Sequence, residues 1–94
     1  MYVQGSVTIT KGFQIWKDMV DGMSEEMAQA GVKFIFAAVE ANDDTKLHVI
    51  LDFKSMDVAK EFMARPEIEE RRRNAGVLIE TTVLIPLGEA RTAE

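Results

Sequence analysis

The sequence predicts one α+β domain with the element order β-α-β-β-α-β. The chain has 94 residues, which is the size of a single small domain. Apolar residues make up 47% and charged residues 29%, as in globular proteins and unlike disordered or membrane-spanning ones. Four segments have strand-like apolar patterns, and two others repeat apolar residues at the helical spacing of three and four.

The first strand and the first helix follow from this periodicity. A strand is expected over residues 2–10, where apolar and polar residues alternate. A helix is expected over residues 13–30, and Gly31 suits the position just after its end. Its apolar stripe consists of Phe13, Trp16, Val20, Met23, Met27 and Ala30, with Met19 beside them. Because Gly22 disfavours a helix interior, we expect a bend or a close approach to the sheet there.

A hairpin follows, with strands over residues 32–40 and 46–54 and a polar turn over residues 41–45. Asp43 and Asp44 belong to this turn, and we prefer that explanation to a weak cation site. The first of the two strands is apolar on both faces. Strict alternation places Val32, Phe34, Phe36 and Ala38 on one face, and Ile35, Ala37 and Val39 on the other.

The second helix is expected to begin after Ser55, whose side chain can cap it. Pro66 is tolerated only at a helix start, so we expect a kink or a break at Arg65-Pro66 and a new segment over residues 66–75. Within that segment, acidic residues precede basic ones by four positions, which favours ion pairs: Glu67 with Arg71, and Glu69 with Arg73. The last strand is expected over residues 77–86.

This element order is that of the ferredoxin-like, or split βαβ, fold. Both helices then cover one face of a four-stranded antiparallel sheet. We expect a single domain over residues 1–94, with a flexible tail over residues 89–94.

The other face of the sheet has no helix to cover it. Alternation assigns fourteen residues to it: Gln4, Ser6, Thr8, Thr10, Ile35, Ala37, Val39, His48, Ile50, Asp52, Leu78, Glu80, Thr82 and Leu84. About half are apolar, which is unusual for a surface facing only water. Since two-fold homodimers are the commonest assembly, we expect this face to pair with a second copy of the chain, the alternative being a monomer with scattered apolar surface residues.

The element order, the segment SMDVAKEFM at residues 55–63 and the charged helix ending Asn74-Ala75-Gly76-Val77 resemble the dimeric α/β-barrel superfamily. The resemblance covers nearly the whole chain and is one of pattern. It implies two sheets facing each other across a dimer axis and a small pocket between helices and sheet. Members include cofactor-independent antibiotic biosynthesis monooxygenases, heme-degrading proteins, muconolactone isomerases and many proteins of unknown function. Trp16 and His48 do not match the heme-degrading arrangement, so no catalytic residue is transferred.

Residue counts exclude several classes of site. The absence of cysteine excludes disulfides, thiolate metal sites and cysteine nucleophiles, and a single histidine excludes a histidine-rich metal site within one chain. A net charge of −5 argues against nucleic acid as a partner. Since GxGxxG and P-loop patterns are missing, we expect no nucleotide cofactor; we also expect no other cofactor and no metal.

The sequence also bears on location. No segment approaches the roughly 20 apolar residues needed to span a bilayer, so we expect no membrane partner. Residues 1–10 lack the basic and apolar regions of a secretory signal. We therefore expect a cytoplasmic protein.

His48 is the first candidate for chemistry. Alternation places it on the uncovered face with Asp52, and Thr8 and Glu80 on other strands could complete a polar cluster. One interpretation is a general base, with His48, Asp52 and Glu80 as catalytic candidates. The other, which we favour, is a hydrogen-bonded histidine at a dimer interface.

The helix stripe supplies a second candidate site. Trp16, Met19, Met23, Phe34 and Phe36 are the predicted ligand-binding residues, because methionine adapts to irregular shapes and aromatic rings accept a flat ligand. Ordinary core packing is the alternative, and the more common one. Arg71, Arg72 and Arg73 could bind an anion, but compensation of the helix dipole explains them better.

The leading hypothesis is a small-ligand-binding homodimer. The alternative is a cofactor-independent monooxygenase or isomerase acting on a small hydrophobic aromatic substrate. A third hypothesis, a purely structural interaction module, predicts a filled core. A cavity beside Trp16 would separate the first two hypotheses from the third.

Overall fold

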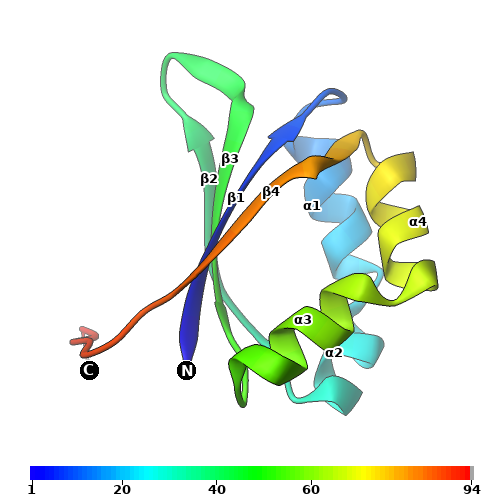
Figure 1. Cartoon of the computed structure of the whole chain (residues 1–94). Coiled ribbons are helices and arrows are strands. Elements are labelled where there is room, and N and C mark those ends of the chain that lie inside the picture. The colour runs from blue at the N-terminus through cyan, green and yellow to red at the C-terminus, as the bar shows by residue number, and fades with distance from the viewer. Residues whose placement is uncertain (94) are drawn as a thin grey trace.

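The computed structural model describes residues 1–93 and contains eight helices and strands (Figure 1). In chain order they are β1 (Tyr2–Ile9), α1 (Phe13–Asp21), α2 (Ser24–Ala30), β2 (Lys33–Glu40), β3 (Asp43–Asp52), α3 (Met56–Ala64), α4 (Pro66–Asn74) and β4 (Val77–Pro86). The strands form one antiparallel sheet with the order β2-β3-β1-β4. All four helices lie on one side of it (Figure 1). The predicted ferredoxin-like fold is confirmed.

Both predicted helices are divided in two. The first is not continuous: the Gly22 and Met23 amides donate to Asp18 and Val20 and close a turn between α1 and α2. The predicted bend therefore becomes a break. The break at Arg65-Pro66 is confirmed, with Pro66 at the start of α4.

The structure also tests the predictions for the Ser55 cap, the hairpin turn and the C-terminal tail. Ser55 caps α3 as expected, its Oγ accepting from the Val58 amide at 3.2 Å. The hairpin turn is shorter than predicted, because β3 already begins at Asp43 and only residues 41–42 remain outside the strands. In the tail, residues 87–93 form no helix or strand, and Glu94 lies outside the described residues.

The core lies between the helices and the sheet in two clusters. One cluster joins the β1 start and the β3 end to α2, α3 and α4 through Val3, Met23, Met27, Val32, Phe53, Ala59, Phe62 and Ile68. The other joins α1 to the opposite half of the sheet through Ile9, Trp16, Leu47, Val49 and Val77. Period-two and period-3.6 patterns place these residues on facing surfaces, which is why they meet.

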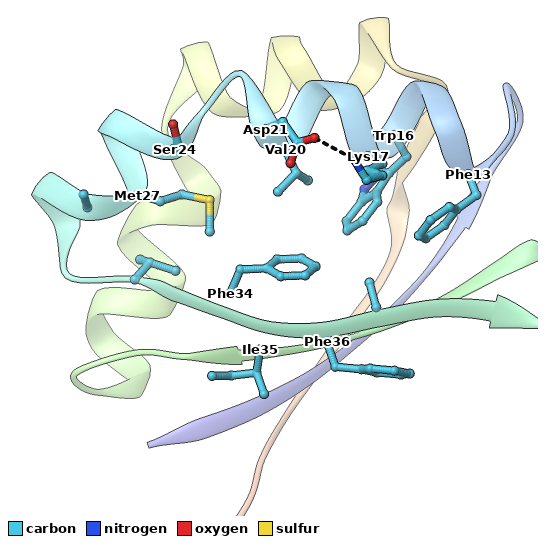
Figure 2. Close-up of a pocket in the computed structure, with 13 residues that line it drawn as sticks. Phe13, Trp16, Lys17, Val20, Asp21, Ser24, Met27, Phe34, Ile35 and Phe36 are labelled. Carbon is cyan, nitrogen blue, oxygen red and sulfur yellow. Dashed lines mark hydrogen bonds and ion pairs between the residues drawn. The ribbon is translucent and has the colours of Figure 1, made fainter.

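A β-bulge in β2 reverses the predicted faces of its second half. Phe34 pairs with Leu51, but the next pair is Phe36 with Ile50, so one extra residue lies in β2. Ala37 and Val39, predicted for the uncovered face, therefore pack toward the helices. Phe36, predicted for the helix side, lies on the opposite side with Ile35 (Figure 2).

A second irregularity reverses the end of β4. The register shifts between Ser6 and Thr8, so Ser6 pairs with Val83 and Gly5 with Leu84. Thr82 and Leu84, predicted for the uncovered face, turn toward the helices. Val83 and Ile85 lie on the uncovered face instead.

The corrected uncovered face is more apolar than predicted. We call its exposed hydrophobic residues the open-face patch: Ile35, Phe36, Leu78, Val83 and Ile85. Together with the flanking Ile50, they make a surface that a helix layer does not cover.

Candidate functional site

A cavity of about 520 Å³ lies between α1, α2 and the edge strand β2 (Figure 2). Its walls are mainly apolar and aromatic, and it opens along the sheet edge. Helices α1 and α2 supply the upper wall with Phe13, Trp16, Val20 and Met27, and β2 supplies the floor with Phe34 and Ala37. Such a space is suited to an apolar molecule of drug-like size.

Trp16 forms the back of this cavity. Only 6% of the residue is exposed, and its ring centre lies 5.9 Å from that of Phe13 and 6.2 Å from that of Phe34. Figure 2 shows the rings of Trp16 and Phe34 directed toward each other from opposite walls. Phe34 remains 43% exposed although it faces the helices, because the space above it is not filled.

The polar groups of the cavity lie at its rim. Lys17 Nζ donates to Asp21 Oδ2 at 2.8 Å across one turn of α1, and Ser24 lies at the start of α2 (Figure 2). The hydrogen bond that Lys17 donates to Asp21 raises the pKa of Lys17, which stays protonated at neutral pH. The cavity thus has a positive and a negative side chain at its rim and an apolar interior.

The predicted ligand-binding residues are only partly brought together. Trp16, Phe34 and Phe36 line the cavity, although Phe36 does so from the far side of β2. Met23 is buried in the core, and Met19 packs against both core clusters. Met27 of α2, which belongs to the same predicted apolar stripe, lines the cavity in their place.

The predicted polar cluster around His48 forms only in part: His48 and Thr8 line the same small hollow, but Asp52 and Glu80 do not. His48 Nε2 lies 2.7 Å from Glu40 Oε2, at the hairpin end of the sheet. Asp52 instead binds the N-terminal amine at 3.0 Å. The Thr8 amide donates to Thr81 Oγ1 at 2.9 Å.

His48 and its predicted companions also lie outside the cavity beside Trp16. Neither His48, Asp52 nor Glu80 lines it. Sequence reasoning missed Glu40 as the partner of His48, and the signal was available: both belong to the two arms of the same hairpin, close to its turn. Their catalytic role stays a prediction.

Of the three consecutive arginines of α4, two form ion pairs at the surface and one is buried. Arg73 pairs with Glu69 at 3.4 Å as predicted, while Arg71 pairs with Glu26 of α2 at 2.8 Å and not with Glu67. This bond from Arg71 lowers the pKa of Glu26. Arg72 turns inward and is buried.

Among residues 1–93, no three histidine, aspartate or glutamate side chains come together in a way that could hold a metal ion. Over the same residues, no helix is both long and apolar enough to cross a membrane.

Comparisons with known proteins identify the fold. No protein-family model matches the chain, and no curated protein matches its sequence. A solved structure of a proposed antibiotic biosynthesis monooxygenase from Deinococcus radiodurans superposes with a TM-score of 0.60 at 10% identity, covering 100% of this chain and 99% of that one. A second solved structure, of an antibiotic biosynthesis monooxygenase, superposes with a TM-score of 0.62 at 12% identity. The match covers 96% of this chain and 98% of that one. At these identities the two likenesses show a shared fold, in agreement with the predicted ferredoxin-like arrangement.

Proposed function

We propose that this protein is a homodimer that binds a small, flat, apolar ligand in the cavity beside Trp16. The observation that carries the proposal is the unfilled space of about 520 Å³ between α1, α2 and β2. This space is open to solvent on one side, and its walls are apolar with two aromatic rings facing each other. A concave apolar surface of this kind favours ligand binding over a purely structural module, which requires a filled core.

The walls favour an aromatic ligand. The ring centres of Trp16 and Phe34 lie 6.2 Å apart, and the angle between the two ring planes is 46°. The two rings therefore present both edges and faces to an aromatic ring bound beside them. The ion pair of Lys17 and Asp21 at the rim can contact one polar substituent. A flat phenol or quinol has this combination of an apolar body and a polar edge.

The open-face patch supports the dimer. Phe36 is 57% exposed, and Ile35, Val83 and Ile85 are about half exposed on the same side of the sheet. These exposed apolar residues lie on both edge strands, with mainly polar residues of β1 between them, and a mixed face of this kind favours association with a partner. Because Ile35 and Phe36 also border the cavity, a second copy on this face would close the cavity along the β2 edge.

Calorimetric titration with 2-naphthol tests the ligand site. We expect saturable binding of one molecule per chain. The variant Ala37→Leu fills the cavity from its floor and should weaken binding at least about tenfold, whereas Ala64→Leu, at the exposed end of α3, should not. Absence of saturable binding, or equal affinities in both variants, would contradict the proposal.

Sedimentation equilibrium tests the assembly. We expect the mass of two chains at micromolar concentration. A single-chain mass at that concentration would show that the open-face patch is not a dimer interface.

The second candidate is catalysis: a cofactor-independent monooxygenase or isomerase acting on the same class of ligand. The two structural neighbours whose names state a monooxygenase favour it, together with the aromatic cavity. Oxygen uptake during turnover of polycyclic phenols or quinols would support oxygenation. Product formation without oxygen uptake would indicate isomerisation, and binding without turnover would leave the ligand-binding function alone.

A cytoplasmic location completes the proposal. A chain without cysteine has no disulfide that would require an oxidising compartment. Fractionation of cells of the source organism, followed by detection of the protein with an antibody, tests this location.

A further inference from the structure

Arg72 differs from its two neighbours on α4. Arg71 and Arg73 form ion pairs with carboxylates at the surface. Arg72 is only 7% exposed, and its side chain lies between α4 and the sheet. It is the one charged side chain buried among residues 1–93. The helix thus directs a guanidinium into an apolar interior.

The Arg72 guanidinium has no carboxylate partner within residues 1–93. Its one side-chain hydrogen bond there runs from Nη2 to Thr82 Oγ1, at 2.8 Å. Glu69, three residues earlier on α4, binds Arg73 instead. Burial lowers the pKa of Arg72, Glu69 partly offsets this and Arg73 adds to it, but an arginine remains charged at neutral pH.

A buried charge without a counter-ion destabilises a fold unless another group compensates it. Arg72 and Thr82 both border a second cavity of about 60 Å³ between α4 and the sheet. Its other walls are largely apolar and include Trp16 and Leu84. The space exceeds the roughly 10–15 Å³ needed for one water, so it can hold a few waters or a small polar group.

We propose that Arg72 and Thr82 form a binding site for a small planar oxyanion, namely a carboxylate. The planar fork of a guanidinium matches the two oxygens of a carboxylate. The Thr82 hydroxyl accepts from Arg72 and still has its own O–H to donate. The buried positive charge then gains the counter-ion that the chain itself does not provide.

Two kinds of molecule can supply this carboxylate. One is a free small acid such as acetate, held in the second cavity. The other is the carboxylate of a larger ligand, because Trp16 borders both this cavity and the first one. The site does not depend on the proposed function, so each can fail alone.

Calorimetric titrations with sodium acetate, 2-naphthoate and 2-naphthol distinguish these sources. The matched variants are Arg72→Met, which removes the charge at similar length, Arg72→Lys, which keeps it without the fork, and Thr82→Val, which removes the hydroxyl. We expect Arg72→Met to lower carboxylate affinity at least about tenfold, with smaller losses for the other two, and to leave 2-naphthol binding unchanged. Tighter binding of 2-naphthoate than of acetate, lost in Arg72→Met, identifies the larger acid; equal affinities identify the free anion.

Thermal unfolding separates this site from a structural role. Without carboxylate, we expect Arg72→Met to unfold at the same or a higher temperature than the original chain, and acetate to raise the unfolding temperature only of the original. The proposal is overturned if carboxylates bind all variants equally or do not bind at all. If Arg72→Met does not fold, unchanged carboxylate affinity in both Arg72→Lys and Thr82→Val is the contradicting result. Binding of 2-naphthol without any carboxylate effect would retain the proposed function and reject this site.

Discussion

The helix–sheet interface differs sharply between its centre and its β2 edge. At the centre, Val3, Phe53, Phe62 and Ile68 are almost completely buried. At the edge, Phe34 faces the same helix layer but remains 43% exposed above an open cavity. Both regions have apolar residues at the interface, so composition does not explain the difference.

The geometry of the helix layer does explain it. The central cluster packs Val3 of β1 against residues of α2, α3 and α4, whereas the cavity at the edge strand β2 is walled on the helix side by α1 and α2; all four helices lie on this side of the sheet (Figure 1). The helix pair beside β2 is also broken at Gly22. The centre therefore provides stability, and the edge provides a space that a ligand can fill.

The largest expected effect is at the centre. Phe53→Ala should lower the free energy of unfolding by about 3–5 kcal/mol, because it removes a fully buried ring and leaves a void. Urea denaturation followed by circular dichroism measures the loss. A loss below about 1 kcal/mol would show that the centre is not tightly packed.

The open face comes next. Ile85→Glu places a charge on both sides of the proposed two-fold interface and should weaken the dimer at least about 100-fold. Ile15→Glu on α1 is the matched control, since Ile15 is 47% exposed and Ile85 49%. Sedimentation velocity compares them, and dissociation of both or neither would contradict the interface.

The same substitution at the edge should affect binding more than stability. Phe34→Ala should weaken 2-naphthol binding about tenfold and lower the free energy of unfolding by only about 1 kcal/mol, because Phe34 is partly exposed already. Calorimetry and urea denaturation give the two values. If the stability loss equals that of Phe53→Ala, the two regions do not differ as described.

A smaller effect is expected where α3 begins. Ser55→Ala removes the acceptor for the Val58 amide and should cost about 1 kcal/mol of folding free energy without changing ligand affinity. Thermal unfolding and calorimetry check both parts. A change in affinity would mean that α3 shapes the edge cavity too.

The smallest effect concerns the surface pair of Glu26 and Arg71. The bond from Arg71 lowers the pKa of Glu26 from 4.5, so its contribution is present above that pH and is lost as the pH falls through the lowered value. Arg71→Ala should return the pKa of Glu26 to its ordinary value in a carbon-13 NMR titration. An unchanged value would show that the pair does not form in solution.

The sequence was sufficient to predict the fold because its signals are local. Alternation, helical spacing, the Ser55 cap and the Pro66 break each act within a few residues, and together they determine the element order. The face assignments of Phe36 and Leu84 were wrong because an odd number of extra residues, one in β2 and three in β4, reverses every later side chain of the strand. Nothing in the local pattern marks such a bulge.

The site was less predictable for a related reason. Trp16 and Phe34 could be chosen as candidates from their residue types, but the space between them depends on how α1 and α2 are oriented over β2. The inward turn of Arg72 was equally invisible, since its neighbours Arg71 and Arg73 are surface residues with the same chemistry. Long-range packing decides both features.

The most direct test of the central claim is a structure of the protein with 2-naphthol bound. We predict density for one naphthol per chain beside the rings of Trp16 and Phe34, with the ring system in contact with Met27 or Val20. A complex with the ligand elsewhere, or a structure in which side chains fill the space between α1, α2 and β2, would contradict the account.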